Sequence, residues 1–147
     1  MDFRRIKFKD LKNADLYLDA VYEGGIKNNA GSEPLVKLLS VSVSRGFRYA
    51  KNKRLCCLFT TQDVPEWPDE FDIENGLFYY WGDNKKPGQE RDGPVGNKSL
   101  KEWFNLASKG KEERKKISPI FVFSSEKGWN RRFQGLLVPG CNKMSEE

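Results

Sequence analysis

Histidine is absent from the 147 residues of this chain. Its absence removes the side chain that proteins use most often as a general base and as a metal ligand. Cysteine is scarce, and two of the three residues, Cys56 and Cys57, are neighbours in a β-prone run. Neighbouring side chains in a strand point to opposite faces, so these two thiols are not expected to share a structural zinc ion.

Long apolar runs are also absent. None approaches the ~20 residues with which a helix crosses a membrane, and the N-terminus lacks the apolar stretch of a secretory segment. An odd number of cysteines in a chain without such a segment favours reduced thiols in the cytoplasm. We therefore expect a cytoplasmic protein with no membrane partner.

Catalytic motifs are missing as well. The chain has neither a Gly-x-Ser-x-Gly motif nor a glycine-rich loop that would bind phosphate. Four acidic residues close in sequence suit a nuclease metal site, but the lysine that such sites add in a fixed strand pattern is not found. These residues are Asp69, Asp72, Glu74 and Asp83. We expect no catalytic residue, no metal and no cofactor, and hence no enzyme activity in this chain.

The chain does have a moderate positive charge and enough length for one domain. Lys and Arg total 26 against 21 for Asp and Glu, which gives a net charge of +5. A charge of this size suits a nucleic-acid partner and an ordinary solvated surface equally. Charge alone therefore does not decide between them.

Apolar periodicity predicts a chain rich in strands. Strands are expected over 16–22, 47–49, 54–61, 77–81, 119–124 and 131–138, with helices from about Ser32 to Leu39 and over 99–107. Ser99 and Glu102 have capping-box spacing, and 63–76, 83–97 and 109–116 are expected to be loops or turns. Because strands do not alternate with helices, the predicted class is α+β, with a curved, barrel-like, mostly antiparallel sheet flanked by short helices.

Four aromatic residues, 78–81, occupy one of these strands and stop at Gly82. Rings beside an acid suit a base that is swung out of a helix, because the base needs flat apolar faces around it and an acceptor for an exocyclic amine. Cytosine carries such an amine at N4. The residues alone leave open the alternative that 79–81 are ordinary sheet residues and that Trp67 plugs a loop.

The segment WPDEFDIENGLFYYWGDNKKPG, followed by GN and a helix, resembles the N-terminal recognition domain of AspBHI-type modification-dependent restriction endonucleases. The similarity extends over about 14–140. These domains resemble SRA (SET and RING associated) domains, which have a crescent of strands flanked by helices and flip 5-methylcytosine into a ring-lined pocket. The resemblance implies an SRA-like or PUA-like fold over 1–140, with 141–147 as a linker or the end of a cloned fragment.

The same resemblance implies a base pocket. Tyr80 is similar to the tyrosine that stacks on the flipped base, Asp69 is the first candidate for its Watson–Crick edge, and Trp67 is the opposite wall. Trp81 stands where the family has a threonine beside the 5-methyl group, which leaves open whether 5-methylcytosine or 5-hydroxymethylcytosine is read. The expected pocket comprises Trp67, Asp69, Asp72, Tyr80, Trp81, Gly82 and Asp83.

Basic side chains near this segment are expected to hold the DNA backbone. The candidates are Arg45, Arg48, Lys85, Lys86, Arg91, Asn97 and Lys98. The implied partners are double-stranded DNA carrying modified cytosine and a nuclease or other effector domain or subunit, in a prokaryotic restriction system. The competing hypothesis is a PUA-like module that binds RNA or a small ligand without flipping a base.

Overall fold

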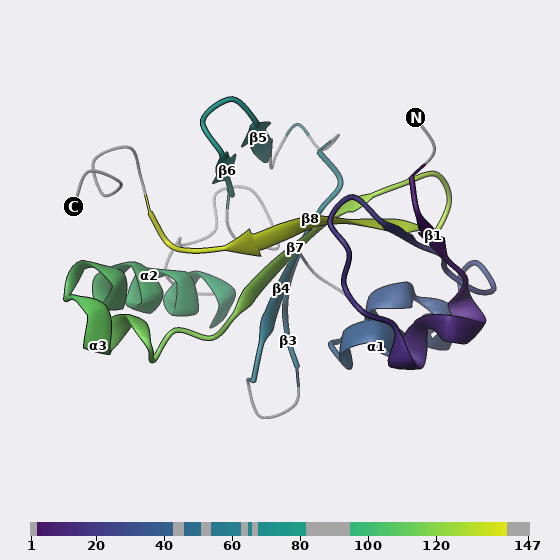
Figure 1. Cartoon of the computed structure of the whole chain (residues 1–147), viewed down its shortest axis with the longest axis horizontal. Coiled ribbons are helices and arrows are strands. Elements are labelled where there is room, and N and C mark those ends of the chain that lie inside the picture. The colour runs from purple at the N-terminus through teal and green to yellow at the C-terminus, as the bar shows by residue number, and fades with distance from the viewer. Residues whose placement is uncertain are drawn as a thin grey trace.

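The structure is a computed structural model that describes residues 3–42, 46–50, 54–62, 65, 68–81 and 95–140. These residues form an α+β fold around a twisted sheet, with helices at both sides of it (Figure 1). The strands of the sheet are β1 (Arg5–Ile6), β2 (Val21–Tyr22), β3 (Phe47–Tyr49), β4 (Cys56–Thr60), β7 (Ile120–Ser125) and β8 (Arg131–Leu137). The helices are η1 (Phe8–Asn13) and η2 (Ala30–Ser32), both 3-10, and α1 (Pro34–Leu39), α2 (Val95–Ser108) and α3 (Lys111–Arg114).

The six strands lie in the order β1-β2-β8-β7-β4-β3. Pairing is antiparallel for β2–β8, β7–β8 and β3–β4, and parallel for β1–β2 and β4–β7. The predicted α+β class and mostly antiparallel pairing are confirmed. The expected barrel-like closure is wrong for the described sheet, which stays open because β1 and β3, the two edge strands, are only two and three residues long and do not meet.

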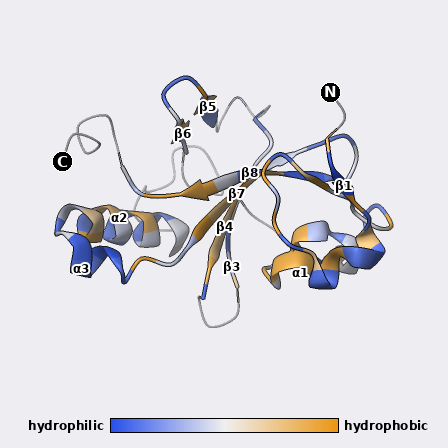
Figure 2. Cartoon of the chain, viewed as in Figure 1, coloured by the Kyte–Doolittle hydropathy of each residue, from blue (hydrophilic) through white to orange (hydrophobic). Residues whose placement is uncertain are grey.

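Two apolar clusters, one on each side of the sheet, form the core. Cys57 of β4 faces the first cluster, which includes Leu35 and Leu39 of α1. Cys56 and Leu58 face the second cluster, which includes Trp103 of α2. The alternation expected for Cys56 and Cys57 is therefore confirmed. Figure 2 shows hydrophobic residues along β7 and at the arrowhead end of β8, and the strongly hydrophilic helix α3.

A two-stranded hairpin of β5 (Glu70–Asp72) and β6 (Leu77–Tyr79) stands apart from the large sheet (Figure 1). Asp72 closes its turn, because its carboxylate accepts hydrogen bonds from the main-chain N–H and the side-chain amide of Asn75 at 3.1 and 2.8 Å. Phe71 and Phe78 stack across the hairpin with ring centroids 4.5 Å apart. The prediction that 63–76 is only a loop is wrong, because cross-strand stacking outweighs the low β-propensity of its acidic residues.

Two other predicted elements have different bounds in the structure. The strand expected over 16–22 is reduced to β2, because Asp19 adopts a left-handed φ of 62° that turns the chain. The helix expected over 99–107 begins at Val95, so Ser99 lies inside α2 and accepts a hydrogen bond from the Tyr49 hydroxyl at 2.5 Å. A cap is instead seen at α1, where Glu33 accepts from the N–H of Val36.

Two further expectations concern the C-terminal part of the chain. The charged segment 109–116 holds the short helix α3 rather than only a turn. The boundary expected at Gly140 falls on the last described residue, and 141–147 lie outside the described part. Across the described ranges, no helix is both long and apolar enough to span a membrane.

Candidate nucleic-acid interface

The candidate site lies where the end of β4 meets the open end of the β5–β6 hairpin. Glu70 pairs with Tyr79 in the hairpin, so Asp69 and Tyr80 occupy the next position on each strand. The main-chain N–H of Trp81 donates to Oδ1 of Asp69 at 2.9 Å. This bond continues the hairpin by one step and fixes the half-buried Asp69 carboxylate against the chain that follows β6.

Thr60, the last residue of β4, also acts on the Asp69 carboxyl group. Its side chain is buried at 2% exposure and is one of the groups that lower the pKa of Asp69. The Thr60 oxygen also accepts the main-chain N–H of Gln62 at 3.2 Å. Gln62 has a left-handed φ of 64°, which turns the chain sharply at the end of β4.

The protonation of Asp69 is set by these surroundings. Burial raises its pKa above the ordinary value, and the hydrogen bonds from the Trp81 N–H and the Thr60 hydroxyl lower it in part. Burial therefore disfavours the charged form of the Asp69 carboxyl group, and the two hydrogen bonds favour it. Perturbed acids of this kind are enriched at functional sites.

The aromatic residues of 78–81 divide between two faces. Phe78 and Tyr80 turn toward the second core cluster, with ring centroids 6.1 Å apart, whereas Tyr79 and Trp81 are 49% and 62% exposed. Trp81 therefore presents its ring to solvent, beside the main-chain N–H that binds Asp69. An exposed tryptophan next to an oriented carboxylate offers a stacking surface and a hydrogen-bond acceptor together.

Gly46 allows Tyr80 to approach the large sheet. A Cβ atom at Gly46 would lie 3.1 Å from the Tyr80 hydroxyl and 3.1 Å from the Phe59 carbonyl oxygen. The Phe59 N–H in turn donates to the Gly46 carbonyl at 2.6 Å. The absence of a side chain at Gly46 thus brings Tyr80 directly onto the end of β4.

The structure brings together three of the residues expected in the base pocket: Asp69, Tyr80 and Trp81. Asp72 lies at the turn of the hairpin, where it binds Asn75, and so is not beside Asp69. The remaining expected pocket residues fall outside the described part of the chain. They are Trp67, Gly82 and Asp83.

Arg48 was expected at the DNA backbone, but its side chain is turned into the protein. It is 3% exposed, and its guanidinium lies 3.2 Å from the carboxylate of buried Glu33. Arg131 binds the same Glu33 oxygen at 3.2 Å, and burial lowers its pKa whereas Glu33 raises it. A phosphate contact by Arg48 therefore does not fit the structure.

Glu33, Arg48 and Arg131 form a buried ion triad that sequence reasoning missed, because the three residues come from distant parts of the chain. The two guanidinium groups lie over the ring of Phe59, 5.1 and 4.4 Å from its centroid. Phe59 directly precedes Thr60 on β4. The triad thus packs against the end of β4.

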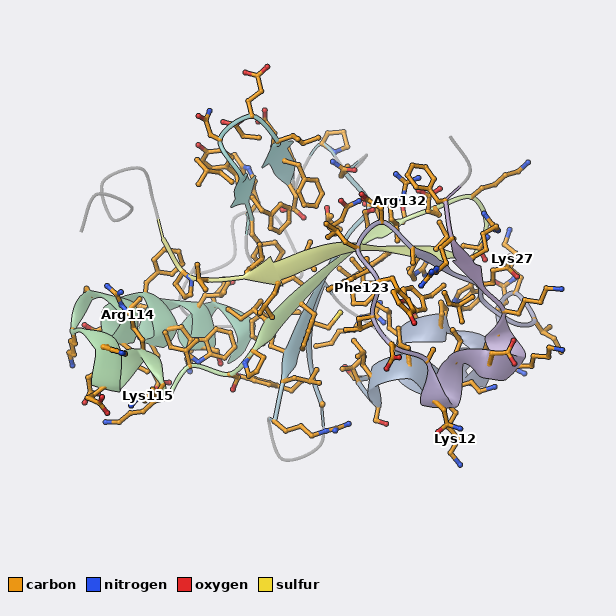
Figure 3. The ribbon with its side chains drawn as sticks, viewed as in Figure 1. Lys12, Lys27, Arg114, Lys115, Phe123 and Arg132 are labelled. Carbon is orange, nitrogen blue, oxygen red and sulfur yellow. The ribbon has the colours of Figure 1, made fainter. Side chains whose placement is uncertain are left out.

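The other expected backbone contacts are spread over α2 and the undescribed segments. Asn97 is buried in the first turn of α2, and Lys98 beside it is exposed. Arg45, Lys85, Lys86 and Arg91 lie outside the described residues. Other lysines are far from the hairpin: Lys12 and Lys27 project on the side of η1 (Figure 3).

A cavity of about 740 Å³ lies between the hairpin, α2 and the end of β8. Its lining includes the apolar side chains of Leu58, Phe78 and Leu100, and it also includes Tyr80. Asp69 and Trp81 do not line it, so the hydrogen-bonding groups of the site lie outside this cavity. Within the described ranges, no group of three or more Cys, Asp or Glu residues is placed to hold a metal ion.

This chain is similar to known proteins in both sequence and fold. Residues 16–147 match the family model described as restriction endonuclease AspBHI N-terminal. A solved DNA recognition domain of the cytosine modification-dependent restriction endonuclease LpnPI is 36% identical over 97% of this chain, with a TM-score of 0.85. The DNA modification-dependent restriction endonuclease AspBHI is 39% identical over 94% of this chain, with a TM-score of 0.80.

The chain spans 66% of the LpnPI recognition-domain chain and 37% of the AspBHI chain. No curated protein matches it.

Proposed function

The chain belongs to the AspBHI N-terminal family of restriction endonucleases, and on that premise we propose that it is a DNA-binding recognition module for modified cytosine. It binds double-stranded DNA that carries 5-methylcytosine or 5-hydroxymethylcytosine and flips the modified base into a pocket at the end of the hairpin. The observation that carries this proposal is the Asp69 carboxylate, which accepts a hydrogen bond from the Trp81 N–H next to exposed and half-buried rings.

Asp69 supplies the hydrogen bond that selects the base. An ionised carboxylate only accepts, and the N4 amine of cytosine donates. Because Oδ1 already accepts from the Trp81 N–H, Oδ2 is the oxygen that turns to the base. Thymine has a carbonyl oxygen at the equivalent position and would meet the carboxylate oxygen to oxygen.

The rings supply the stacking faces. Tyr80 is the wall next to β4, where Gly46 gives it room, and Trp81 contributes its exposed ring beside Asp69. Trp67 is the opposite wall in this proposal. Stacking of a base on a ring contributes roughly 1–3 kcal/mol per base and does not depend on the base, so the distinction between cytosine and thymine comes from Asp69.

Phosphate contacts hold the duplex while the base is out. Lys98 is exposed at the first turn of α2, and the proposal adds Arg45, Lys85, Lys86 and Arg91 as further contacts. Asn97 is buried, so its role is to hold this turn rather than to bind phosphate by its side chain. Such contacts bind DNA of any sequence and fix its register.

Cleavage belongs to another domain or subunit in this proposal. The LpnPI domain that matches is described as a DNA recognition domain, and the share of AspBHI that this chain spans is 37%. Both observations support a reader that directs a nuclease without cutting DNA itself.

A single binding experiment separates this function from its alternative. Fluorescence anisotropy would compare a duplex with one 5-methylcytosine, its 5-hydroxymethyl and unmodified versions, and single-stranded RNA of the same sequence. We expect the tightest binding to a modified duplex. Equal binding to all of them, or tighter binding to RNA, would contradict the proposal. Tighter binding to RNA would favour the PUA-like alternative. In that alternative, the apolar cavity behind Tyr80 would hold a small apolar ligand or an RNA base.

A further inference from the structure

The excess positive charge of the chain is concentrated in one segment, 98–116. This segment has seven basic and three acidic residues, a net charge of +4, whereas the whole chain has +5. The seven basic side chains are all exposed, and they lie on α2, on α3 or directly after these helices: Lys98, Lys101, Lys109, Lys111, Arg114, Lys115 and Lys116. A surface of one charge sign on an otherwise almost balanced chain is typical of a site for an anionic partner.

Part of this charge is neutralised within α3. Lys115 lies 2.9 Å from Glu112, and Lys116 lies 2.8 Å from Glu113. Within the described part of the chain, three of the other lysines form no ion pair with a carboxylate. These are Lys98, Lys109 and Lys111.

Lys98 and Lys109 lie on the same side of α2, the side that faces solvent. The eleven residues between them make about three turns of an α-helix, which has about 3.6 residues per turn. Exposed Asn105 lies between them, about two turns after Lys98. The buried residues Trp103 and Ala107 occupy the opposite side. The exposed side of α2 thus has a lysine near each end.

The buried side fixes this helix against the large sheet. Trp103 stacks on Phe47 of β3 with ring centroids 5.9 Å apart. The Tyr49 hydroxyl of the same strand donates to Ser99 at 2.5 Å. The direction in which α2 presents its lysines is therefore set by the fold.

Helix α3 continues the basic side of α2. The Nε–H of Arg114 donates to the main-chain carbonyl of Ala107 at 2.7 Å, which ties α3 to the end of α2. Lys111, the first residue of α3, is thereby held beside the end of α2. Both helices lie at the opposite end of the molecule from α1 (Figure 1).

Helix α2 is also next to the proposed base pocket. Phe78 and Tyr80 of the aromatic segment line the same cavity as Leu100 and Phe104 of α2. A duplex with its base at Tyr80 therefore passes close to α2. The distance from Lys98 to Lys109 along the helix axis is about 16 Å, which corresponds to roughly five base pairs at about 3.4 Å each.

We propose that Lys98, Lys109 and Lys111 form a track that binds the DNA backbone on one flank of the modified base, an inference that rests on the proposed function. The pocket fixes the register of the duplex, and α2 extends from the pocket in one direction only. The track therefore contacts one flank, several base pairs from the modified base. An acidic protein surface would also suit these lysines, but the pocket beside α2 brings a duplex to them.

The test uses three duplexes, each with one 5-methylcytosine in one strand. The first has long flanks, and each of the others is cut back close to the modified base on one side. Lys109→Ala with Lys111→Ala removes the far part of the track without touching the pocket, and alanine favours the helix. On the long duplex, it should reduce the slope of log K against log salt concentration by about 1.8, the value for two phosphate contacts.

Dependence on one flank is the decisive result. Lys109→Ala with Lys111→Ala should weaken binding to the two duplexes that keep the contacted flank, and should not affect the duplex that lacks it. Lys109→Arg with Lys111→Arg should restore the wild-type slope. The ratio of affinities for methylated and unmodified DNA should stay at its wild-type value, because phosphate contacts do not read the base.

The matched control removes the same charge elsewhere. Lys12→Ala with Lys27→Ala acts at the other end of the molecule (Figure 3), so any loss of affinity should be equal for the three duplexes. This control separates a local contact from the general effect of net charge.

The outcomes are distinct for the two proposals. Wild-type protein that binds methylated and unmodified duplexes equally would overturn the proposed function. Wild-type protein that prefers methylated DNA, with a Lys109→Ala, Lys111→Ala variant that weakens all three duplexes equally or none of them, would overturn the track alone. Unchanged binding to all three would assign these lysines to an acidic protein surface instead.

Discussion

The main-chain N–H of Trp81 donates to Oδ1 of Asp69 across the open end of the hairpin, at 2.9 Å. A main-chain donor cannot turn away, so it decides how any residue that replaces Asp69 is oriented. The hydrogen bond therefore links the last ring of the aromatic segment to the residue proposed to select the base.

Asp69→Asn should abolish the preference for modified cytosine. The Trp81 N–H selects the amide orientation that places the carbonyl oxygen at Oδ1, and so the amide NH₂ takes the place of Oδ2. That NH₂ faces the N4 amine of cytosine, donor against donor. In anisotropy titrations, the variant should bind methylated and unmodified duplexes equally, at the weak affinity that phosphate contacts give. A variant that keeps the full preference would show that Asp69 does not contact the base.

Replacing the Tyr80 ring should weaken binding to methylated DNA. Tyr80→Leu keeps an apolar side chain in the second core cluster but removes the flat face, which contributes roughly 1–3 kcal/mol, or about 5- to 150-fold in affinity. Tyr79→Leu is the matched control, because it removes a neighbouring exposed ring from the opposite face of β6. Circular-dichroism melts of both variants would detect a fold defect. Equal losses of affinity in the two variants would show that Tyr80 does not stack on the base.

DNA binding should weaken as the salt concentration rises, and Lys85 and Lys86 should account for part of this dependence. Each phosphate contact contributes about −0.9 to the slope of log K against log salt concentration, so Lys85→Ala with Lys86→Ala should reduce the slope by about 1.8. Methylated and unmodified DNA should lose affinity equally. The matched control is Lys12→Ala with Lys27→Ala, two exposed lysines on the side of η1 (Figure 3). If the control changes the slope and the first pair does not, the DNA lies on the η1 side.

Arg48→Met should reduce stability and leave the salt dependence of DNA binding unchanged. Breaking a buried ion pair typically costs about 3–5 kcal/mol, and a value near 3 is expected here because Arg131 still binds Glu33. Arg5→Met is the control, since it breaks the exposed Arg5–Glu23 pair and should cost less than about 1 kcal/mol. Urea unfolding measures both. Similar costs for the two variants would show that the triad does not fix the end of β4.

The order of apolar residues along the chain predicted the strands whose position depends on burial. The apolar run around Cys56 and the apolar residues of 131–138 predicted β4 and β8 to within two residues, because burial on a strand leaves a clear mark on the sequence. The hairpin strand β5 was missed because its pairing depends on Phe71 stacking on Phe78 rather than on β-propensity.

Long-range geometry explains what the sequence did not reveal about the site. The resemblance pointed to Asp69, Tyr80 and Trp81, and these residues do lie together at the end of the hairpin. Arg48 was placed at the surface because its charge suits phosphate, whereas in the fold it meets Glu33 inside the protein.

Base flipping is the central claim, and 2-aminopurine fluorescence tests it most directly. This base analogue is dim while stacked and brightens when its neighbour leaves the helix. Placed next to 5-methylcytosine, it should brighten when wild-type protein binds, and it should stay dim with Asp69→Asn at a concentration that saturates the DNA. Unchanged fluorescence with wild-type protein at full affinity would show that the base stays in the helix, and would contradict the pocket proposed at Asp69 and Tyr80.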